Sequence, residues 1–384
     1  MPDRAPGSEL VVSGSAFGDA LADLGAADLA AFAEGRSHFM DEEGVADGLG
    51  PVFNEASCVA CHIGPHSAVG GSTGRLETRF GKVNPDGTFN PLADEGGSLL
   101  QDHGIGLTPD GRWTFGAEEL PNDAAVIAKR RTTPLFGLGL VDAVPDAEIR
   151  AIAAVQRIFA PAIAGKVAVV TDLAAGKQAV GKFGWKNGNP TLFQFSGDAY
   201  LNEMGITSPF FPDENCPQGD CASLQYNPRP DLNDATGEDV QFFADFMTFL
   251  GPPPRGPTTF TSLRGELIFA VIGCGQCHVP TLVTGEHPVP ALNKKVFQPF
   301  SDFLLHDMGA LGDGIAQGAA GPREMRTAPL WGLSGNPAFL HDGSAVTPED
   351  AILAHDGQGG RARDRFAGLD ASEKAALLAF LDTL

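Results

Sequence analysis

Two short segments of this chain place a pair of cysteines directly before a histidine. Residues 58–62 read CVACH and residues 274–278 read CGQCH, and both fit the C-x-x-C-H pattern of covalent c-type haem attachment. Thiols at this spacing can add to the two vinyl groups of one porphyrin, and the histidine that follows can then bind its iron. We therefore predict two c-type haems, attached through Cys58, Cys61, Cys274 and Cys277 and ligated by His62 and His278.

Two further cysteines, Cys216 and Cys221, lie together in the acidic segment DENCPQGDCAS. They are far in sequence from both motifs, so a zinc site with four convergent ligands is disfavoured. Haem is attached to such motifs outside the cytoplasm, where disulfides also persist. We predict a Cys216–Cys221 disulfide that closes a small acidic loop, and the alternative is a pair of free thiols.

The composition narrows the classes of partner and the location. The chain of 384 residues has 26 Lys and Arg against 48 Asp and Glu, a net charge of −22, which argues against nucleic acid. This charge favours a neutral or cationic partner, or only a soluble surface. No apolar run is long enough to span a membrane. We expect a periplasmic protein whose signal peptide, absent from this chain, has been removed.

The elements that must position the two motifs also occur twice. Residues 131–138 (RTTPLFGL) recur as 326–333 (RTAPLWGL), each after its own motif. Apolar residues at three- and four-residue steps predict a closing helix at 238–250 and another at 372–384. Between the halves, residues 251–257 read GPPPRGP, which no helix can cross. The sequence therefore predicts a duplicated module.

From this duplication we predict two cytochrome c-like haem domains, at 1–250 and 258–384. The first contains an insertion at about 166–230, which has no counterpart in the second half and is expected to cover a haem edge. With 49 Gly and 29 Pro, the fold should be mainly α, with long irregular loops and little sheet.

At this point several segments resemble a known family, the di-haem oxidoreductases related to bacterial di-haem cytochrome c peroxidases. The resemblance runs over nearly the whole chain, and it is carried by the segments GLGPVFN (48–54), FGWKNGNPTL (183–192), LNEMGITSPFFP (201–212), LLHDMG (304–309) and FLHDG (339–343). It implies an all-α, two-domain fold, a haem in each domain, and activity with hydrogen peroxide or a related oxidant. A calcium ion between the domains would also fit it, although no compact carboxylate loop identifies one. The chain is similar, more distantly, to di-haem enzymes that oxidise residues of a partner protein.

One position departs from the family pattern. In the peroxidases, the resemblance implies, the second haem has a methionine ligand some way after the histidine of a short H-x-G motif. Here His341 opens that motif, and the candidate position holds His355. We predict His355 as the second iron's other ligand, which would lower the potential relative to methionine. Met308 is the alternative.

The first half differs at the equivalent position. Pairing the two RT-x-P octets and then sliding to the stretches at 148–149 and 351–352 places Ile152 opposite His355, and an apolar side chain cannot bind iron. The first haem is therefore expected to be five-coordinate and to meet the oxidant, with Glu148 as the acid/base that moves a proton between peroxide oxygens. The alternative for Glu148 is a solvated first-turn helix residue. His66 or His103 could instead close this iron at rest.

Aromatic and basic residues near the motifs have two interpretations each. Trp185 and Trp113 could carry an electron between haems, or they could be core residues. Arg131 and Arg326, at equivalent repeat positions, could pair with haem propionates or cap local backbone.

These features together favour an enzyme, a di-haem peroxidase whose second haem relays electrons from a donor protein to the first. Two other functions stay open. A pure electron carrier would have both irons six-coordinate and would not react with an oxidant. A di-haem oxidase would dock a specific protein substrate in place of the donor.

Overall fold

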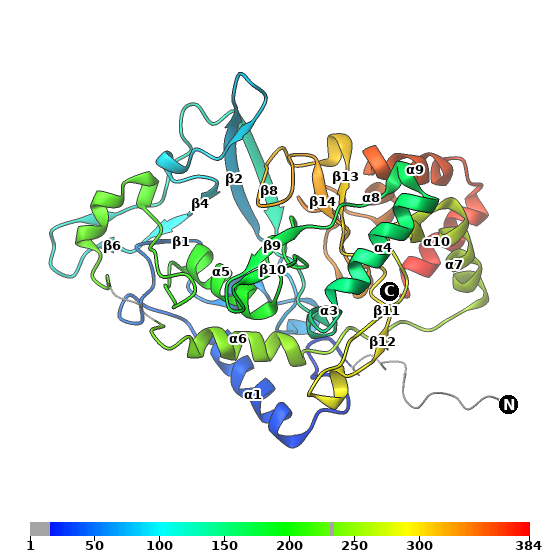
Figure 1. Cartoon of the computed structure of the whole chain (residues 1–384), viewed down its shortest axis with the longest axis horizontal. Coiled ribbons are helices and arrows are strands. Elements are labelled where there is room, and N and C mark those ends of the chain that lie inside the picture. Colours follow the sequence, from blue (N-terminus) through cyan, green and yellow to red (C-terminus); the bar gives the residue numbers. More distant parts are fainter. Residues whose placement is uncertain (1–15, 231–233) are drawn as a thin grey trace.

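The computed structural model describes residues 16–230 and 234–384 of the chain. Helix makes up 37% and strand 16%, so the fold is mixed and the expectation of a mainly α protein with little sheet was too strong. The strands gather in the first half, where β2 (Leu76–Val83) pairs antiparallel with β8 (Val126–Arg131) and lies between β3 (Phe89–Asn90) and β4 (Leu99–Leu100). Figure 1 shows strands β2 and β8 in the upper middle of the molecule and helices α7 to α10 toward its right-hand end.

The sequence pattern did not predict this sheet, but local chemistry explains why it forms. The segment between the first motif and its octet is broken by glycines and prolines, so it cannot form a long helix. Antiparallel pairing satisfies its backbone groups instead. Smaller strands complete this lobe: β1 (Val52–Phe53) with β5 (His103–Gly104), and β6 (Gly106–Leu107) with β7 (Thr114–Phe115).

The first motif lies on a frame of two crossing helices. Helix α1 (Ala26–Met40) precedes it and packs on the closing helix α6 (Glu238–Phe249). The helices approach closely because Gly35 has no side chain to meet the Phe242 carbonyl. The short helix α2 (Cys58–Cys61) carries the motif itself. The predicted closing helix at 238–250 is confirmed to within one residue.

The second motif has the same frame. Helix α7 (Phe260–Ile272) leads into it and packs on α10 (Ala371–Leu381), with Gly265 against the Ala376 carbonyl. Two short helices, α8 (Pro348–Ala354) and α9 (Gly360–Ala367), lie between them in sequence. Small antiparallel pairs complete this half: β11 (Leu282–Val283) with β12 (Val296–Phe297), and β13 (Leu305–Asp307) with β14 (Glu324–Arg326).

The two octets fold alike, as the duplication predicts. Gly137 and Gly332 have φ of 69° and 71°, a left-handed conformation that favours glycine. The N–H of Gly137 donates to the Leu250 carbonyl at 3.1 Å, and that of Gly332 donates to the Leu384 carbonyl at 2.6 Å. Each octet is therefore tied to the last residue of its own closing helix region.

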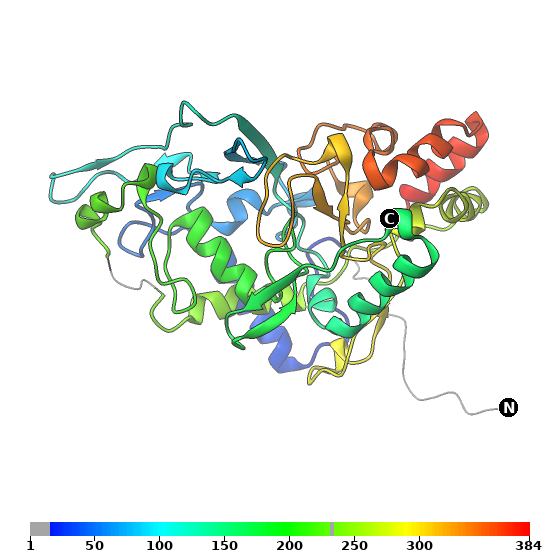
Figure 2. The ribbon, with the colours of Figure 1, turned by 45° about the horizontal axis from the view of Figure 1, so that its top comes forward.

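The segment between the first octet and α6 has elements of its own. Helices α3 (Leu138–Asp142) and α4 (Asp146–Phe159) are followed by the hairpin β9 (Val169–Asp172) and β10 (Lys177–Val180) and by α5 (Leu192–Met204). Helix α5 packs on α6. Figure 2 shows α5 beside the α1/α6 pair, so this part of the predicted insertion covers the first half.

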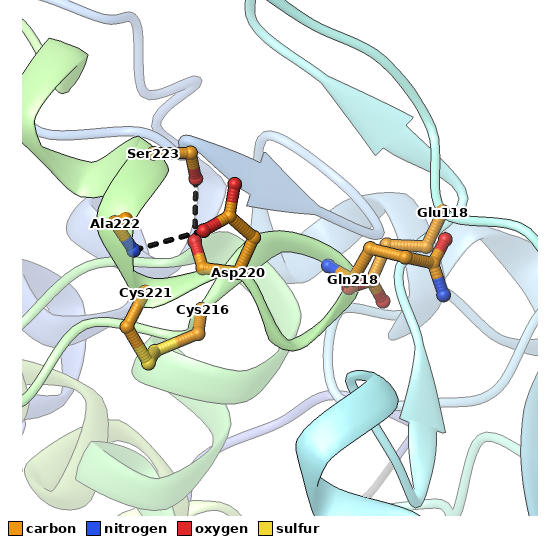
Figure 3. Close-up of a disulfide and its surroundings, with 7 residues drawn as sticks. All are labelled: Glu118, Cys216, Gln218, Asp220, Cys221, Ala222 and Ser223. Carbon is orange, nitrogen blue, oxygen red and sulfur yellow. Dashed lines mark hydrogen bonds between the residues drawn. A yellow bond between two sulfur atoms is a disulfide. The ribbon is translucent and has the colours of Figure 1, made fainter.

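The predicted disulfide is confirmed. Cys216 and Cys221 are bonded, with their Cα atoms 4.5 Å apart. Figure 3 shows the bridge with Gln218 of the loop and Glu118 nearby. The Gln218 N–H donates to Glu118 Oε1 at 2.7 Å, and Gln218 Oε1 accepts the Glu119 N–H at 2.8 Å. The disulfide therefore stabilises the loop through which Gln218 connects the predicted insertion to residues 118 and 119 of the strand-rich part of the first half.

Apolar packing is continuous across the molecule. The largest cluster of buried side chains includes Phe246 and Val141 of the first half with Phe297 and Phe303 of the second. A second cluster, around Phe366 and Phe380, belongs to α7, α9 and α10. Within residues 16–230 and 234–384, no helix is both long and apolar enough to cross a membrane.

Candidate haem sites

Helix α2 fixes the geometry of the first motif. The His62 N–H donates to the Cys58 carbonyl at 3.0 Å, so His62 caps the turn that carries both thiols. The His62 ring meets the edge of Phe39, with 5.9 Å between centroids. Burial lowers the pKa of His62 to about 4. The imidazole is therefore neutral at physiological pH, the form that binds a metal.

All four motif cysteines are unpaired thiols. Burial raises the pKa of Cys58, Cys61 and Cys274 to about 12. A redox-active dithiol needs the opposite shift, because the thiolate is the reactive form. The environment thus disfavours a thioredoxin-like use of these pairs and is compatible with thiols that are consumed in attaching a cofactor.

The second motif brings two imidazoles close together, with their ring planes tilted by 59°. His278 follows the turn η6 (Cys274–Gln276), and His355 ends helix α8. Their ring centroids lie 6.4 Å apart. His278 Nδ1 is 3.0 Å from the Phe300 carbonyl oxygen, and His355 Nδ1 is 2.7 Å from that of Ala351. Each Nδ1 can donate to its carbonyl, which leaves both Nε2 atoms available as ligands.

This arrangement fits an iron between the two rings. Two metal–nitrogen bonds of about 2 Å each, added to the distance from Nε2 to each ring centre, require nearly the observed 6.4 Å. Burial lowers the pKa of both His278 and His355, which favours the neutral form that can bind a metal. Both rings line a cavity of about 620 Å³, together with Cys274 and Cys277. The residues present therefore suit a haem.

The alternative ligand lies beside His355. Met308 lines the same cavity, and a Cβ on Gly359 would be 3.3 Å from the Met308 methyl carbon and 3.1 Å from His355 Cδ2. Both candidates thus belong to one part of the wall. Of the two candidates, His355 is the one whose ring contacts His278, which also contacts the ring of Phe269.

A charged pair next to the second motif was not anticipated from the sequence. His306 Nε2 lies 3.0 Å from Asp302 Oδ2, and both side chains are buried. Although burial opposes it, hydrogen bonding to Asp302 raises the pKa of His306 to about 11. Its Nδ1 is 3.7 Å from Cys277 Sγ. The LLHDMG segment could have suggested His306, but Asp302 has no sequence signal of its own.

Those residues also bear on the calcium expectation. We looked for groups of three or more His, Cys, Asp or Glu side chains whose ligand atoms lie within 4.8 Å of one another. Within the described residues, the only such group is Cys277, Asp302 and His306. That group has one carboxylate, whereas calcium takes six to eight oxygen ligands. A calcium ion therefore stays a prediction.

A buried acid next to the first motif was also missed. Glu203, at the end of α5, accepts a hydrogen bond from Asn54 Nδ2 at 2.7 Å. Burial, and then the carboxylate of Glu77, raise the pKa of Glu203 to about 8. The Glu203 charge is in turn the first electrostatic contribution that raises the pKa of Cys61. Glu203 lies in the family-like segment LNEMG, which is the signal that could have identified it.

Glu77 links this acid to the interior. Arg79 holds Glu77 with two hydrogen bonds, at 2.9 and 3.2 Å. Arg130 Nη1 lies 3.9 Å from Glu77 and its Nη2 lies 2.7 Å from the buried Asp313. Lys186 binds Asp313 as well, at 2.8 Å. Ion pairs therefore run from the first site into the second half.

Glu148, the predicted acid/base, lies on α4, which is not one of the two helices (α1 and α6) that frame the first motif. Glu148 is half-buried near the start of α4, and it forms no hydrogen bond or ion pair through its carboxylate in the described structure. Ile152 is partly buried against the main core. Gln156 of the same helix donates to the Gln276 carbonyl at 2.7 Å. Helix α4 thus contacts the second motif, and the roles of Glu148 and Ile152 stay predictions.

The two histidines proposed to close the first iron have other surroundings. His66 is exposed, with a φ of 56°. His103 stacks on Phe53 at 5.5 Å, and its Nδ1 is 3.0 Å from the Asn54 carbonyl oxygen. Neither ring contacts His62 in the described part of the chain.

Trp185 lines the cavity of the second motif, and its Nε1–H donates to the Arg131 carbonyl at 2.9 Å. Trp113 instead stacks on Tyr226 at 4.6 Å, in the β lobe near the disulfide. Arg131 donates to the Ala338 carbonyl and Arg326 to the Gly184 carbonyl, so both arginines bind backbone, while both also line the cavity.

Comparison with known proteins gives the class. Residues 115–384 match the family described as "Di-haem oxidoreductase, putative peroxidase". No curated protein matches. Among solved structures, a MauG-like protein associated with microbial copper homeostasis has 16% sequence identity and a TM-score of 0.41, covering 92% of this chain and 89% of that one.

A second solved structure is more distant. Kuenenia stuttgartiensis hydrazine synthase has 19% identity and a TM-score of 0.29, covering 46% of this chain. This chain spans 65% of that one.

The paired motifs and the duplicated helical frame define a di-haem protein with oxidoreductase chemistry. The chain belongs to the di-haem oxidoreductase family, and it is an enzyme of that class.

Proposed function

We propose that this enzyme is a periplasmic di-haem peroxidase. In this proposal the motif of Cys58, Cys61 and His62 holds the haem that meets peroxide. The motif of Cys274, Cys277 and His278, with His355, holds the haem that receives electrons. Both haems would be covalently attached, within domains at 1–250 and 258–384. A calcium ion between the domains belongs to the same proposal.

The observation that carries the proposal is the difference in histidines between the two sites. The second site has two neutral imidazoles 6.4 Å apart. In the described part of the first site, the His62 ring contacts the Phe39 ring and no second imidazole. Haem supplies a redox-active iron, and a free coordination position allows it to react with an oxidant. An asymmetric pair thus suits one oxidant site and one relay.

Residues of this chain would supply the proton chemistry. Glu148 is the proposed acid/base of the first site, since a carboxyl group that accepts and returns a proton lowers the barrier to breaking the peroxide bond. Glu203 is the nearest competitor, because its raised pKa of about 8 keeps it protonated at neutral pH beside Cys61.

Arg131, Thr132 and Trp185 offer a short route between the sites. The Thr132 side chain interacts with the Cys61 thiol and partly offsets the rise in its pKa. Its neighbour Arg131 accepts the Trp185 Nε1–H through its carbonyl. Trp185 lines the cavity that contains Cys277 and His278. We propose that electrons received at the second site pass through Trp185 to the first.

The test is a set of absorption and electron paramagnetic resonance spectra of the oxidised and half-reduced protein, with and without hydrogen peroxide. One high-spin and one low-spin haem are expected, and peroxide or cyanide should perturb only the high-spin signal. Two low-spin haems without any response to peroxide would contradict the proposal and favour a pure electron carrier. Peroxide-dependent oxidation of a co-purified protein would favour the oxidase that modifies a partner.

A further inference from the structure

One tyrosine hydroxyl is buried among the aromatic rings beside the first motif. The chain has 26 phenylalanines and only two tyrosines. Tyr200 of α5 is 3% exposed, and its hydroxyl donates a hydrogen bond to Glu43 Oε1 at 3.2 Å. A phenylalanine would fill the same space without requiring a partner for a buried hydroxyl. Packing alone therefore does not explain this hydroxyl and its carboxylate partner.

A row of aromatic rings joins Tyr200 to the histidine of the first motif. The His62 ring contacts Phe39 of α1 with 5.9 Å between centroids, and Phe39 contacts Phe243 of α6 at 6.3 Å. Phe243 in turn contacts the Tyr200 ring at 5.0 Å. The helices that carry these rings, α1, α5 and α6, lie together in the fold (Figure 1). An electron can therefore pass between Tyr200 and the first haem site through short gaps in a dry core.

The phenol of Tyr200 can lose an electron only together with its proton. Burial, and then the charge of Glu43, raise the pKa of Tyr200, so the phenol is neutral. An oxidised phenol that kept its proton would be a buried cation, which is costly. Phenylalanine has no such proton and holds its ring electrons more tightly. Phe39 and Phe243 therefore bridge the gap, and Tyr200 is the ring that can be oxidised.

Glu43 has the properties of the proton acceptor. It lies within hydrogen-bond distance of the phenol, which is the geometry that proton transfer requires. Burial raises the pKa of Glu43 as well, which makes its carboxylate a stronger base. Its side chain is only partly buried, so a proton taken from Tyr200 can be shared with solvent. The proton and the electron of Tyr200 thus have separate routes, one from the hydroxyl and one from the ring.

We propose that Tyr200 is a redox site of the first half, which gives one electron toward the first haem and its phenol proton to Glu43. The inference rests on the proposed function, in which the first site meets peroxide. Reducing one peroxide molecule to two waters breaks its O–O bond and takes two electrons, with two protons from solvent. In the fully oxidised protein the second site has no electron to give. One electron then comes from the first haem and the other from Tyr200, which becomes a neutral phenoxyl radical until the donor protein returns the electron and Glu43 the proton.

The test is electron paramagnetic resonance of the oxidised holoprotein, frozen rapidly after mixing with hydrogen peroxide in the absence of an electron donor. An organic radical signal is expected, and ring-deuterated tyrosine should narrow it, whereas ring-deuterated tryptophan should not. Tyr200→Phe keeps the ring and removes only the hydroxyl, so it should abolish the signal. Glu43→Gln can still accept the hydrogen bond but cannot take the proton, so the radical should form about 10²-fold more slowly.

The chain offers a matched control for each variant. Tyr226→Phe removes the only other tyrosine hydroxyl, on a ring that stacks on Trp113, and Glu34→Gln changes an exposed glutamate of α1. Neither should alter the radical. A signal that persists in Tyr200→Phe, or that only labelled tryptophan narrows, would overturn the inference.

A second oxidant separates this inference from the proposed peroxidase. A haem spectrum that responds to peroxide without any tyrosyl radical would overturn the inference and leave the peroxidase standing. A ruthenium photo-oxidant can oxidise the holoprotein without peroxide. A Tyr200 radical that forms under light, in a protein that does not react with peroxide, would support the redox site and reject the proposed peroxidase. The absence of the radical with both oxidants would overturn the inference.

Discussion

The two halves share a frame but differ in what surrounds the cofactor. In each, a helix before the motif crosses a closing helix at a glycine, Gly35 in the first and Gly265 in the second. Beside Cys61 lies Glu203, a carboxyl group that is neutral at pH 7. Beside Cys277 lies the ion pair of His306 with Asp302. The two halves therefore share the helical frame around the motif and differ in the charges that lie beside it.

A second difference concerns what covers each site. The second cavity is closed by α8 and α9, which the same half supplies directly after its octet. In the first half the octet leads to α3 and α4, and α4 contacts the other motif through Gln156. The halves are thus not interchangeable, since a helix of the first supports the second. The predictions below test this asymmetry.

The largest expected effect is the loss of one haem. Replacing Cys58 and Cys61 with alanine removes both thioether bonds of the first site, so mass spectrometry should show one haem addition in place of two. The matched change of Cys274 and Cys277 should remove the other one. If two haems stay bound in either variant, the attachment assignment is wrong.

The next effect concerns the acid/base of the first site. Glu148→Gln should slow the reaction with peroxide by about 10²–10⁴-fold, as for a lost acid/base, with cyanide affinity less affected. Stopped-flow spectra measure both. Glu238→Gln, a change at another first-turn helix glutamate, is the control and should have little effect. A loss in Glu203→Gln without one in Glu148→Gln would transfer the role to Glu203.

The third effect is confined to the second half. His355→Met should keep that haem six-coordinate and raise its potential, because thioether ligation favours the reduced iron. His355→Ala should leave it five-coordinate and high-spin. Redox titration and electron paramagnetic resonance spectra measure these changes. Unchanged spectra in both variants would assign the ligand to Met308.

The sequence predicts best those features that depend on residues close together along the chain. The two motifs, the disulfide and the closing helices are carried by residues within a few positions of each other, and they appear in the structure at those positions. The pairing of β2 with β8 depends on residues about fifty apart, and no short pattern announces it. Glu203 meets Asn54 across 149 residues, so its raised pKa is a property of the fold alone.

The same reasoning explains why the predicted equivalence of Ile152, on α4, and His355 does not correspond to equivalent positions in the structure. Aligning residues 148–149 with 351–352 places Ile152 opposite His355 in sequence, but this alignment needs a shift from the register of the octets, because the segment after each octet differs in length. The ring centroids of His355 and His278 lie 6.4 Å apart. Helix α4 instead contacts the second motif, because Gln156 donates hydrogen bonds to the Gln276 carbonyl and to Asp302. Sequence equivalence within a repeat therefore does not guarantee spatial equivalence.

The fourth effect tests the region that only the first half has. The Cys216–Cys221 bridge closes a loop of five residues' separation, for which lost chain entropy in the unfolded state predicts about 2 kcal/mol of stabilisation. Replacing both cysteines with serine should lower the unfolding free energy by about that amount and loosen the contacts of Gln218. Denaturant unfolding measures the stability, and hydrogen exchange at the Gln218 and Glu119 amides measures the loosening. Alkylation of both thiols without reductant would show that no bridge exists.

The smallest effect is a pH dependence specific to the first half. Glu203 has a folded-state pKa raised from 4.5 to about 8 by burial and by Glu77, whereas in the unfolded chain it ionises near its ordinary value. The folded state therefore binds the proton more tightly, and this stabilisation is complete below pH 4.5 and is lost as the pH rises through 8. Glu203→Gln cannot ionise, so its unfolding free energy should fall less between pH 5 and 9 than that of the wild type. Glu286→Gln, at an exposed carboxylate paired with Lys294, should follow the wild type. Parallel curves for all three proteins would mean that Glu203 titrates normally, and the contrast between a neutral acid at Cys61 and an ion pair at Cys277 would then be lost.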